Sequence, residues 1–458
     1  METPQPPNPF FALGQSVGLA AFVWGYPLIE TLRTCRMMVG GPDGPQDPRQ
    51  FPMETLRHKQ AVNTSEDRTV VASATDLLYG SAWINLANGP RVVTVPSSVK
   101  HKGRYFVMAM YDAWTNNFAN PRSVTAPNEG ERFVMVGPGT PQSVVLPADL
   151  RVVNAPTDLV WMIPRVLVDD PKHLDPVFAL QADMQVECPP QTHAGRVPSS
   201  IRDWVGNLKN PIDDLVARPS AAAEIAEHFF TNLCHAMVDT PAPQDEQGIV
   251  AWFKTARIVP ALNFSWSALP KPLRDGLQQG LVDAVALIQA AANVDANALN
   301  KKPWDIHLHL GRYGNDFLLR ALVAWRGLGA NAGEVSLYGK CHNDASGEQL
   351  DGKHRYTLRF APDQLPPADA FWSVTLYNQD RFFYPNRLER FSLGSLDKHL
   401  HRDPDGGITM LLCHEDQGDD PNWIPTPPGA FYLSLRIYEP SPEVKDWIGP
   451  LPSRIAAN

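Results

Sequence analysis

The sequence has few cysteines, and its charged residues are sparse. Five cysteines in 458 residues are an odd number, widely spaced and without a Cys-x-x-Cys pair, which argues against a disulfide framework and a structural zinc site. Charged residues make up 19% of the chain, below the roughly 25% of an average soluble domain. Because the net charge is -9 and the basic residues are scattered, we expect no nucleic-acid partner.

The short motifs of nucleotide-dependent enzymes and metalloproteases are also missing. The chain contains no G-x-G-x-x-G after a strand, no P-loop, no H-E-x-x-H and no kinase signature, so we expect no cofactor and no bound metal. Gly14-Gln-Ser-Val-Gly18 fits the G-x-S-x-G pattern of a nucleophile elbow, but it falls inside an expected helix, so we assign it no catalysis. His307 and His309 could share one face of a strand, yet no third metal ligand is identified.

A targeting segment is not evident in the sequence. The N-terminus lacks the basic region of a signal peptide, and Gln15, Ser16 and several glycines interrupt its apolar part. We find no uncharged run that would cross a bilayer, and therefore expect a cytoplasmic protein without a membrane partner. A homo-oligomer is left open.

The length and the apolar content of the chain suffice for several domains. Apolar residues make up 43%, and 44 prolines indicate many loops and strand ends. Periodicity predicts an N-terminal helix and loop at residues 1–60, with the helix over 13–37, a β-rich domain at 61–190, a helical module at 191–333 and a second β-rich domain at 334–458. The predicted fold is α+β and multi-domain, with two antiparallel β-sandwich or jelly-roll-like parts joined by the helical module.

Two strands are expected to differ in burial. Residues 103–111 are apolar on both faces, which predicts a strand buried on both faces. In residues 430–439, apolar residues alternate with Tyr432, Ser434, Arg436 and Tyr438, which predicts a half-buried antiparallel strand.

Several motifs follow one another in a fixed order along nearly the whole chain. They include Phe22-Val-Trp-Gly-Tyr-Pro-Leu28, Tyr79-Gly-Ser-Ala-Trp-Ile-Asn-Leu86, Asp112-Ala-Trp-Thr-Asn116, Phe371-Trp-Ser-Val-Thr-Leu-Tyr377, Asn422-Trp423 and Leu435-Arg-Ile-Tyr438. On these residues the chain resembles the paired domains of unknown function catalogued as 1254, in the N-terminal half, and 1214, in the C-terminal half. The resemblance implies two β-sandwich-like parts joined by helices, and no settled chemistry. It also leads us to expect Asn and Thr where this chain has Ala74 and Leu77.

Polar and aromatic side chains gather in the N-terminal β-rich domain. A buried strand that ends in Asp-Ala-Trp-Thr-Asn-Asn places a carboxylate, two amides and an indole at one rim, and Asp112 could act as a general base if burial raised its pKa. The alternative is that Asp and Asn cap turns while Trp fills the core. The candidate residues are Asp76, Tyr79, Trp83, Asp112, Trp114, Asn116, Asn117 and Arg165.

Arg320, together with Tyr313, is a second candidate. It lies in an otherwise apolar helical stripe. A buried Arg needs a partner, which is either a structural carboxylate or an anionic ligand.

These residues favour a cofactor-independent enzyme of the hydrolase or lyase class. We expect acid/base or hydrolytic chemistry on a small organic molecule, in a cleft between the β-sandwich and helical modules. Asp112 or Asp76 would be the base, Tyr79 the proton donor, and Arg165 or Arg320 the residue that binds an anionic group. The alternative is a non-catalytic protein that binds a small molecule or carbohydrate, and a structural or assembly protein is a third candidate.

Overall fold

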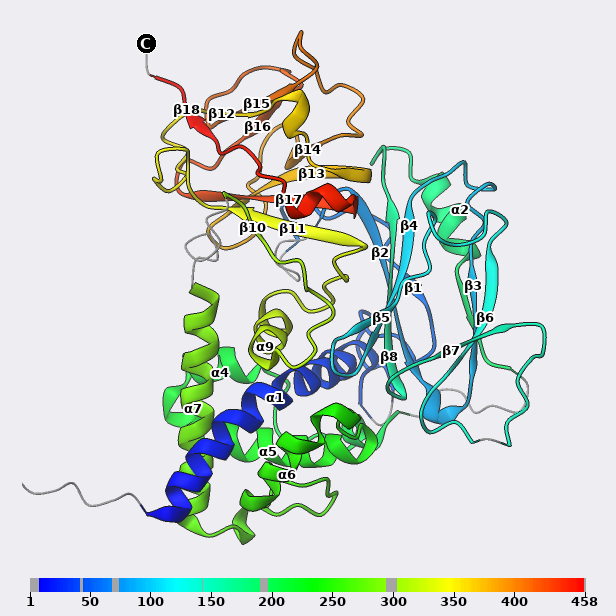
Figure 1. The fold of residues 1–458 in the computed structure, drawn as a ribbon, viewed down its shortest axis with the longest axis vertical. Coiled ribbons are helices and arrows are strands. Elements are labelled where there is room, and N and C mark those ends of the chain that lie inside the picture. Colours follow the sequence, from blue (N-terminus) through cyan, green and yellow to red (C-terminus); the bar gives the residue numbers. More distant parts are fainter. Residues whose placement is uncertain are drawn as a thin grey trace, which may run out of the picture.

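The chain folds into a layer of helices and two β parts, as Figure 1 shows. The computed structural model describes residues 8–41, 44–67, 74–141, 143–189, 197–293 and 303–456. Four sheets, each antiparallel or mixed, accompany helices of very different length. The prediction of an α+β, multi-domain protein is therefore confirmed.

The N-terminal β part has two sheets around one core. The first sheet has the strand order β1 (Arg57–His58), β2 (Leu77–Asn85), β8 (Leu159–Leu167), β4 (Phe106–Asp112), β5 (Asn117–Ala119). The second has the order β7 (Arg151–Asn154), β6 (Glu131–Val136), β3 (Arg91–Val95), β9 (Gln185–Glu187). Ile84 and Met108 of the first sheet share the core with Val93 and Phe133 of the second, and α2 (Asp175–Asp183) adds Leu180.

The C-terminal β part is built in the same way. Its first sheet has the order β10 (Asp305–Ile306), β11 (Ser336–Cys341), β17 (Phe431–Pro440), β13 (Ala368–Asn378), β14 (Ser392–Gly394). Its second has the order β16 (Trp423–Pro425), β15 (Ile408–Cys413), β12 (Tyr356–Phe360), β18 (Ser453–Arg454). Trp372 and Leu435 of the first sheet meet Leu358 and Met410 of the second in a common core.

One strand pair in each part departs from the predicted antiparallel arrangement. β7 pairs with β6 in parallel, and β16 pairs with β15 in parallel. The connections before these strands, residues 137–150 and 414–422, are long enough to return the chain to the other end of the sheet, which a tight hairpin turn cannot do.

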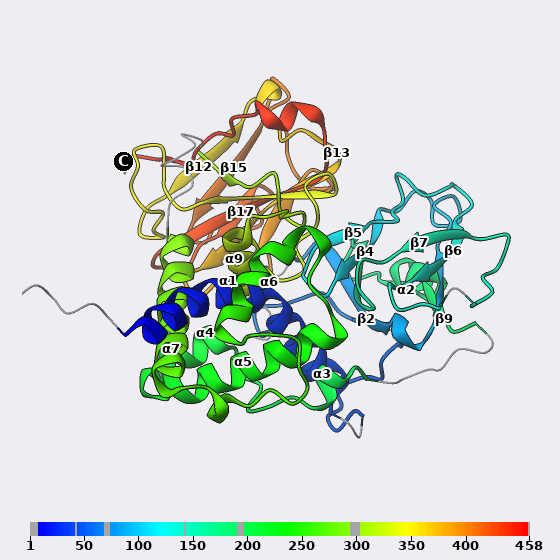
Figure 2. The ribbon, with the colours of Figure 1, turned by 60° about the horizontal axis from the view of Figure 1, so that its bottom comes forward.

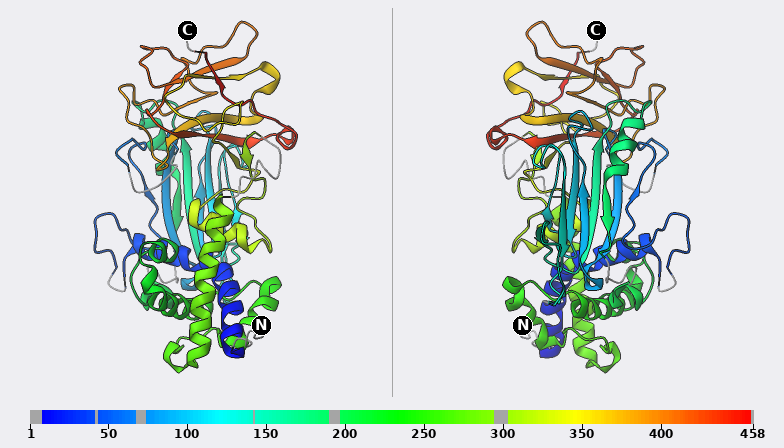
Figure 3. Two further views of the ribbon diagram at one scale, coloured as in Figure 1. Left: turned by 90° about the vertical axis from the view of Figure 1, so that its left-hand side faces the viewer. Right: turned by 90° about the vertical axis from the view of Figure 1, so that its right-hand side faces the viewer.

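Strand β17 is buried on both faces, so the prediction of a half-buried strand is wrong. Leu435 and its apolar neighbours face the C-terminal core, while Ser434, Arg436 and Tyr438 on the other face are 5% exposed or less. That second face lies against the N-terminal β part, across whose end the C-terminal part sits in Figure 3. Strand β4, by contrast, is buried on both faces as predicted.

The helical layer is organised around two long helices (Figure 2). α1 (Pro9–Val39) runs beside α7 (Lys271–Asn293), and α9 (Phe317–Arg326) also packs on α1. α1 begins at Asn8, whose side chain accepts a hydrogen bond from the Phe10 N–H, and it continues through Pro27, so it is longer than predicted. The layer also contains α3 (Ser199–Arg202), α4 (Pro211–Ala217), α5 (Ala222–Asp239) and α6 (Gln247–Phe253).

Helix α1 corrects the expectation that no segment could cross a membrane. By length and composition this helix would suffice, and it lies near the N-terminus. In the folded chain, however, 67% of its most apolar 18-residue stretch is buried, against α7 and α9. Core helices and signal sequences share these properties, so the cytoplasmic location stays a prediction.

Helices α1 and α7 approach so closely that their contact accepts only glycine. Gly14 and Gly18 of α1 face Gly276 and Gly280 of α7. A Cβ atom added to Gly276 would lie 2.2 Å from the carbonyl oxygen of Phe11, far closer than van der Waals contact allows. The paired G-x-x-x-G spacing thus lets two backbones touch.

This packing also explains the G-x-S-x-G pattern in the sequence. Ser16, its central residue, is exposed and donates its hydroxyl to the carbonyl oxygen of Ala12 within the same helix. The two glycines of the pattern serve the contact with α7, and the described residues before the serine form a helix instead of a strand.

We predict that Gly276→Ala destabilises the protein by about 1–3 kcal/mol, because the added methyl group overpacks a backbone contact. Gly248→Ala is the matched control, since a Cβ there meets nothing within 4 Å and alanine favours the helix by about 0.5–1 kcal/mol. The midpoint of urea unfolding, followed by tryptophan fluorescence, measures both variants. Equal midpoints for the two variants would contradict the close helix contact.

Candidate functional site

Two sheets turn polar, buried faces toward each other between the β parts. Tyr79 on β2 pairs in register with Arg165 on β8, and both side chains point away from the N-terminal core, to which the adjacent Leu78 and Val166 belong. From the other side, β11, β13 and β17 present hydroxyls and Arg436. We call this the inter-sheet site and define it by Asp76, Tyr79, Tyr111, Arg165, Tyr338, Ser373, Arg436 and Tyr438.

Arg165 is the most unusual residue of this site. It is 5% exposed, and its Nη2 donates to the carbonyl oxygen of Gly329 at 2.5 Å and to the Tyr111 hydroxyl at 3.2 Å. Its Cζ lies 5.7 Å from the centroid of the Tyr79 ring. Its Nη1 is buried and has no hydrogen-bond partner, and no carboxylate of the described residues forms an ion pair with it. Burial acts to lower the pKa of Arg165, but the hydroxyls of Tyr111, Tyr338 and Tyr79 raise it above its ordinary value.

The position of Gly329 allows its carbonyl oxygen to accept a hydrogen bond from Arg165. It has a φ of +81°, and a Cβ at this position would lie 2.8 Å from Cδ1 of Ile163 on β8. A side chain is therefore excluded both by the backbone conformation and by the sheet beneath. The Tyr111 hydroxyl lies 2.8 Å from the same carbonyl oxygen and 2.7 Å from Oδ1 of Asn331.

Asp76 joins the two β parts just before β2 begins. Its Oδ2 accepts a hydrogen bond of 2.6 Å from the Ser373 hydroxyl, and its Oδ1 accepts one of 3.3 Å from the Tyr438 hydroxyl. Asp76 is partly exposed, as are Tyr79 and Tyr338. The carboxylate is thus oriented by the C-terminal part while it remains reachable from solvent.

Arg436 lies deeper on the same face of β17. It donates from Nη1 to Oγ1 of Thr375 at 2.9 Å and from Nη2 to the Tyr377 hydroxyl at 2.8 Å. Burial acts to lower the pKa of Arg436, but Tyr377, Tyr438 and Asp76 raise it above its ordinary value. Both guanidinium groups of the inter-sheet site are therefore charged at any physiological pH.

The tyrosines of the site are protonated at neutral pH. Burial raises the pKa of Tyr79 to about 12, while Arg165 and Arg436 oppose that rise. Burial, with Asp76 next in effect, raises the pKa of Tyr438 well above its ordinary value. Each hydroxyl can therefore donate a proton or a hydrogen bond, and the two arginines stabilise the tyrosinate that a proton transfer would leave.

An ion pair closes the site on its other side. Arg122 of the N-terminal part donates from Nε to Oε1 and Oε2 of Glu439 at 2.8 and 2.9 Å, and the Tyr105 hydroxyl donates to Oε1 at 3.1 Å. This pair is neutral as a unit. The inter-sheet site as defined contains two guanidinium groups, those of Arg165 and Arg436, and one carboxylate, that of Asp76.

Asp112 lies in a different place, at the end of β4 in a tight turn. Its Oδ1 accepts the backbone N–H groups of Trp114 and Asn116 at 2.9 and 2.8 Å, and its Oδ2 accepts the Asn116 side-chain amide at 3.0 Å. Burial raises its pKa to about 6, against the effect of these hydrogen bonds. The shift has the direction that the general-base hypothesis requires, but the oxygens are occupied by the turn.

Arg320 is paired with a structural carboxylate, that of Glu246. It is fully buried on α9 and donates from Nη1 and Nη2 to Glu246 at 2.8 and 3.0 Å, while the Trp24 indole donates to the same carboxylate at 2.6 Å. Its Cζ lies 5.4 Å from the ring of Trp114. Burial raises the pKa of Tyr313, which lies near Arg320 and Asp112. The second candidate thus belongs to a closed cluster rather than to an open site.

The remaining candidates, Trp83 and Asn117, stabilise the fold. Trp83 stacks on Trp161 with 4.7 Å between ring centroids. Asn117 donates from Nδ2 to the Met110 carbonyl and accepts the Ala332 N–H, which ties residues 309–335 to the sheet. The structure therefore separates the candidates, with Asp76, Tyr79 and Arg165 in the inter-sheet site and Asp112, Trp114, Asn116, Tyr313 and Arg320 beyond the end of β4.

The two histidines considered as metal ligands do not share a strand face. β10 ends before them, His307 is partly exposed, and His309 lies in an exposed turn. Across the part of the chain that the structure describes, no group of three His, Cys, Asp or Glu side chains is placed to hold a metal ion.

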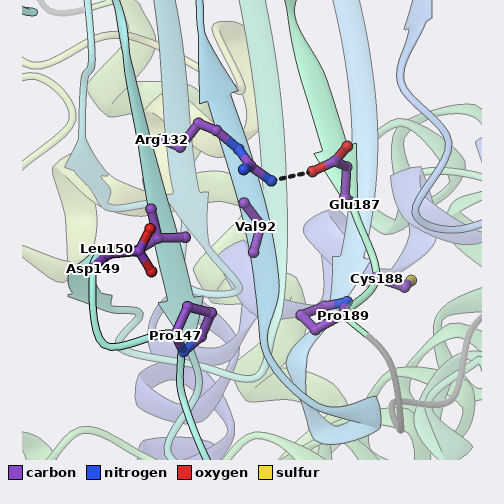
Figure 4. Close-up of a pocket in the computed structure, with 8 residues that line it drawn as sticks. All are labelled: Val92, Arg132, Pro147, Asp149, Leu150, Glu187, Cys188 and Pro189. Carbon is purple, nitrogen blue, oxygen red and sulfur yellow. Dashed lines mark hydrogen bonds and ion pairs between the residues drawn. The ribbon is translucent and has the colours of Figure 1, made fainter.

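A pocket of about 390 Å³ lies elsewhere, on the outer sheet of the N-terminal part (Figure 4). Arg132 and Glu187 line it and form an ion pair of 2.7 Å, in which both side chains are about half exposed. None of the residues that the sequence singled out lines this pocket. We therefore do not assign the function to it.

Five residues of the inter-sheet site were not predicted from the sequence, namely Tyr111, Tyr338, Ser373, Arg436 and Tyr438. A signal was present in β13 and β17. Their non-core faces carry hydroxyls, aromatic rings and a lone Arg, whereas a solvated strand face is usually rich in Lys and Glu.

Comparisons place the chain among proteins without a known activity. The family described as "Protein of unknown function (DUF1254)" matches residues 53–188, and that described as "Protein of unknown function (DUF1214)" matches residues 335–442. The crystal structure of the VPA0106 protein from Vibrio parahaemolyticus is similar with a TM-score of 0.70 at 19% identity, over 97% of this chain and 100% of that one. A putative uncharacterized protein from Burkholderia cenocepacia gives a TM-score of 0.42 at 12% identity, over 96% and 98%. No curated protein matches the chain.

We predict that Arg320→Met lowers the stability by about 3–5 kcal/mol, because Glu246 is left as a buried, unpaired carboxylate. The double variant Arg320→Met with Glu246→Gln should recover much of this loss, since the amide oxygen can still accept from Trp24. Urea midpoints of the wild type and the two variants measure the effect. A wild-type midpoint for Arg320→Met would show that the pair is not structural.

The raised pKa of Asp112 predicts that the stability of the protein depends on pH. Its folded pKa of about 6 exceeds the unfolded value, so the folded state binds the extra proton. Stability from this group is full below about pH 4 and declines by up to about 3 kcal/mol as the pH rises to 6. The wild type should therefore lose stability relative to Asp112→Asn between pH 4 and 6, and not above, in urea unfolding at each pH. A difference that is constant over this window would contradict the burial of an ionised Asp112.

Proposed function

We propose a function for the chain from the residues of its inter-sheet site. The chain belongs to the family of proteins in which a DUF1254 domain precedes a DUF1214 domain, and neither domain has an assigned activity. The protein is a cofactor-independent enzyme of the hydrolase or lyase class. It performs acid/base chemistry on a small organic molecule that carries an anionic group. Asp76 is the base, Tyr79 the proton donor, and Arg165 the residue that binds the anion.

The observation that carries this proposal is the state of Arg165. An ionised side chain buried without a counter-ion costs several kcal/mol, and proteins seldom keep one for stability alone. Arg165 Nη1 is buried, has no acceptor and faces the same layer as Asp76 and Tyr79. A ligand anion would supply the missing acceptor and the missing charge together.

The pairing of Asp76 with Tyr79 supports acid/base chemistry. The Asp76 carboxylate is held by two hydroxyls of the C-terminal part, so its orientation is fixed before a substrate arrives. Tyr79 has a pKa of about 12 and two arginines nearby, so it keeps its proton at neutral pH and can release it to a developing anion. These are also the two polar residues that the chain retains in the segment where Ala74 and Leu77 replace the expected Asn and Thr.

Non-catalytic binding of a small molecule or carbohydrate is the second candidate. It is favoured by the two oxygens of Asp76, each of which already accepts a hydrogen bond. Hydrogen bonds to a carboxylate make it a weaker base, whereas they do not weaken a binding site.

Other expectations stay proposals. We propose that each pair of sheets forms a β-sandwich or jelly roll, which the shared cores support. A cytoplasmic location without nucleic-acid or membrane partners is supported by the net charge of -9 and by the burial of α1. The division of the chain near residues 60, 190 and 333 stays a prediction.

To test the proposal, the purified protein is incubated with mixtures of small anionic metabolites, and conversion is followed by mass spectrometry. Asp76→Asn should lower the turnover of a converted compound by about 10²- to 10⁴-fold, the usual contribution of a general base. Asp112→Asn, whose carboxylate is bound by its own turn, is the control and should retain turnover.

Two outcomes would contradict the assignment. Undiminished turnover in Asp76→Asn removes Asp76 as the base. Compounds that bind to the wild type without any conversion favour the non-catalytic candidate.

A further inference from the structure

We infer that the ligand of the inter-sheet site is a monocarboxylate with an apolar body, bound through one carboxylate oxygen to Arg165 Nη1. The inference rests on the proposed function, since it names the substrate class of the same site. It can nevertheless be tested by binding alone.

The charge balance selects a monoanion. Within the site, Arg165 and Arg436 face Asp76, and the neighbouring pair of Arg122 and Glu439 is neutral by itself. Among the residues that define the site, one added negative charge balances the two guanidinium groups against Asp76. A phosphate dianion would instead leave it with a net negative charge, which a buried environment disfavours.

The hydrogen-bond donors also favour a carboxylate over a phosphate. Nη2 of Arg165 is already engaged by the Gly329 carbonyl and the Tyr111 hydroxyl, so Nη1 is the open donor of this guanidinium. One carboxylate oxygen satisfies Nη1 and the other can accept from a tyrosine hydroxyl. The site as defined contains no lysine, and no described helix begins at one of its residues, although these are the groups that usually bind phosphate.

Aromatic rings beside the donors suit an apolar body. Phe371 and Tyr438 stack with 4.1 Å between ring centroids, and Tyr105 meets Phe371 edge-on at 5.4 Å. The ring of Tyr79 lies against the Arg165 guanidinium. A ligand headed by a carboxylate on Arg165 would therefore extend along aromatic surfaces.

Entry requires the two β parts to separate slightly. Arg165 Nη1 has no contact with solvent in this structure, whereas Asp76, Tyr79 and Tyr338 nearby are partly exposed. Besides the aromatic contacts, the interface contains hydroxyl and carboxylate contacts, and interfaces between domains of one chain commonly permit relative movement.

The experiment measures binding to the full chain by isothermal titration calorimetry. The probes are butyrate, phenylacetate and benzoate, with benzamide as the neutral analogue and phenyl phosphate as the dianion. We expect at least one carboxylate to bind, and benzamide and phenyl phosphate to bind at least about 10-fold more weakly than benzoate. Binding of none of the carboxylates, or tighter binding of phenyl phosphate, would overturn the inference.

Arg165 variants identify the anchor. Arg165→Met should weaken carboxylate binding by about 10- to 100-fold, as expected for the loss of a charge-assisted hydrogen bond. Arg165→Lys keeps the charge and should restore part of the affinity, which separates loss of the anchor from loss of the fold. Arg132→Met, in the exposed ion pair of the separate pocket, is the control and should bind as the wild type does. Equal affinity of Arg165→Met and the wild type would overturn the inference.

The two proposals fail in different ways. Carboxylate binding that depends on Arg165, without conversion by the wild type, leaves this inference standing and removes the enzymatic proposal. Conversion of a phosphorylated compound that depends on Asp76 does the reverse.

Discussion

The contact between two polar sheet faces determines how this molecule is put together. On one side stand Tyr79, Tyr111 and Arg165, and on the other Ser373, Arg436 and Tyr438. Their hydrogen bonds link chain segments that lie about three hundred residues apart, such as Asp76 with Ser373. Because a buried polar layer is stable only when its members are satisfied, the two β parts must meet in one arrangement. Arg165 Nη1, a buried donor that meets no acceptor among the described residues, is therefore significant.

Arg165 and Arg320 are both buried arginines, but they have different roles. Both are buried and both lie near aromatic rings. The charge of Arg320 is neutralised by Glu246 in a bidentate ion pair, which makes it part of the scaffold between α9 and the turn before α6. Arg165 is held in place by a backbone carbonyl and a hydroxyl, neither of which neutralises it. The scaffold thus fixes the position of a charge without cancelling it, which is the arrangement of a preorganised anion site.

Much of the fold could be predicted from local sequence, because local pattern reports local structure. Helix α1, the doubly buried β4 and the apolar alternation of β17 follow from side-chain periodicity. The second burial of β17 does not, since periodicity shows that a face is polar and not what lies upon it. Likewise, the glycine pattern around Ser16 could be identified as packing only when Gly276 and Gly280 were found opposite it.

The candidate site was predictable in part for the same reason. Asp76, Tyr79 and Arg165 were identified from their chemistry, and so were Asp112 and Arg320, which the structure places apart from them. The two sets of residues differ in whether each charged side chain has a partner of opposite charge. Such a partner can be distant in sequence, since Glu246 lies 74 residues from Arg320. Long-range pairing of this kind leaves no local signal.

The central claim is that Arg165 is retained for a ligand and not for stability, and urea unfolding of Arg165→Met without ligand tests it most directly. The Tyr111 hydroxyl lies 2.8 Å from the Gly329 carbonyl oxygen, so it can donate to that oxygen when the guanidinium is removed. The account predicts a midpoint equal to or above that of the wild type, because an uncompensated buried charge is exchanged for an apolar side chain of similar size. A loss of about 3 kcal/mol or more, as expected when a buried ion pair is broken, would contradict it.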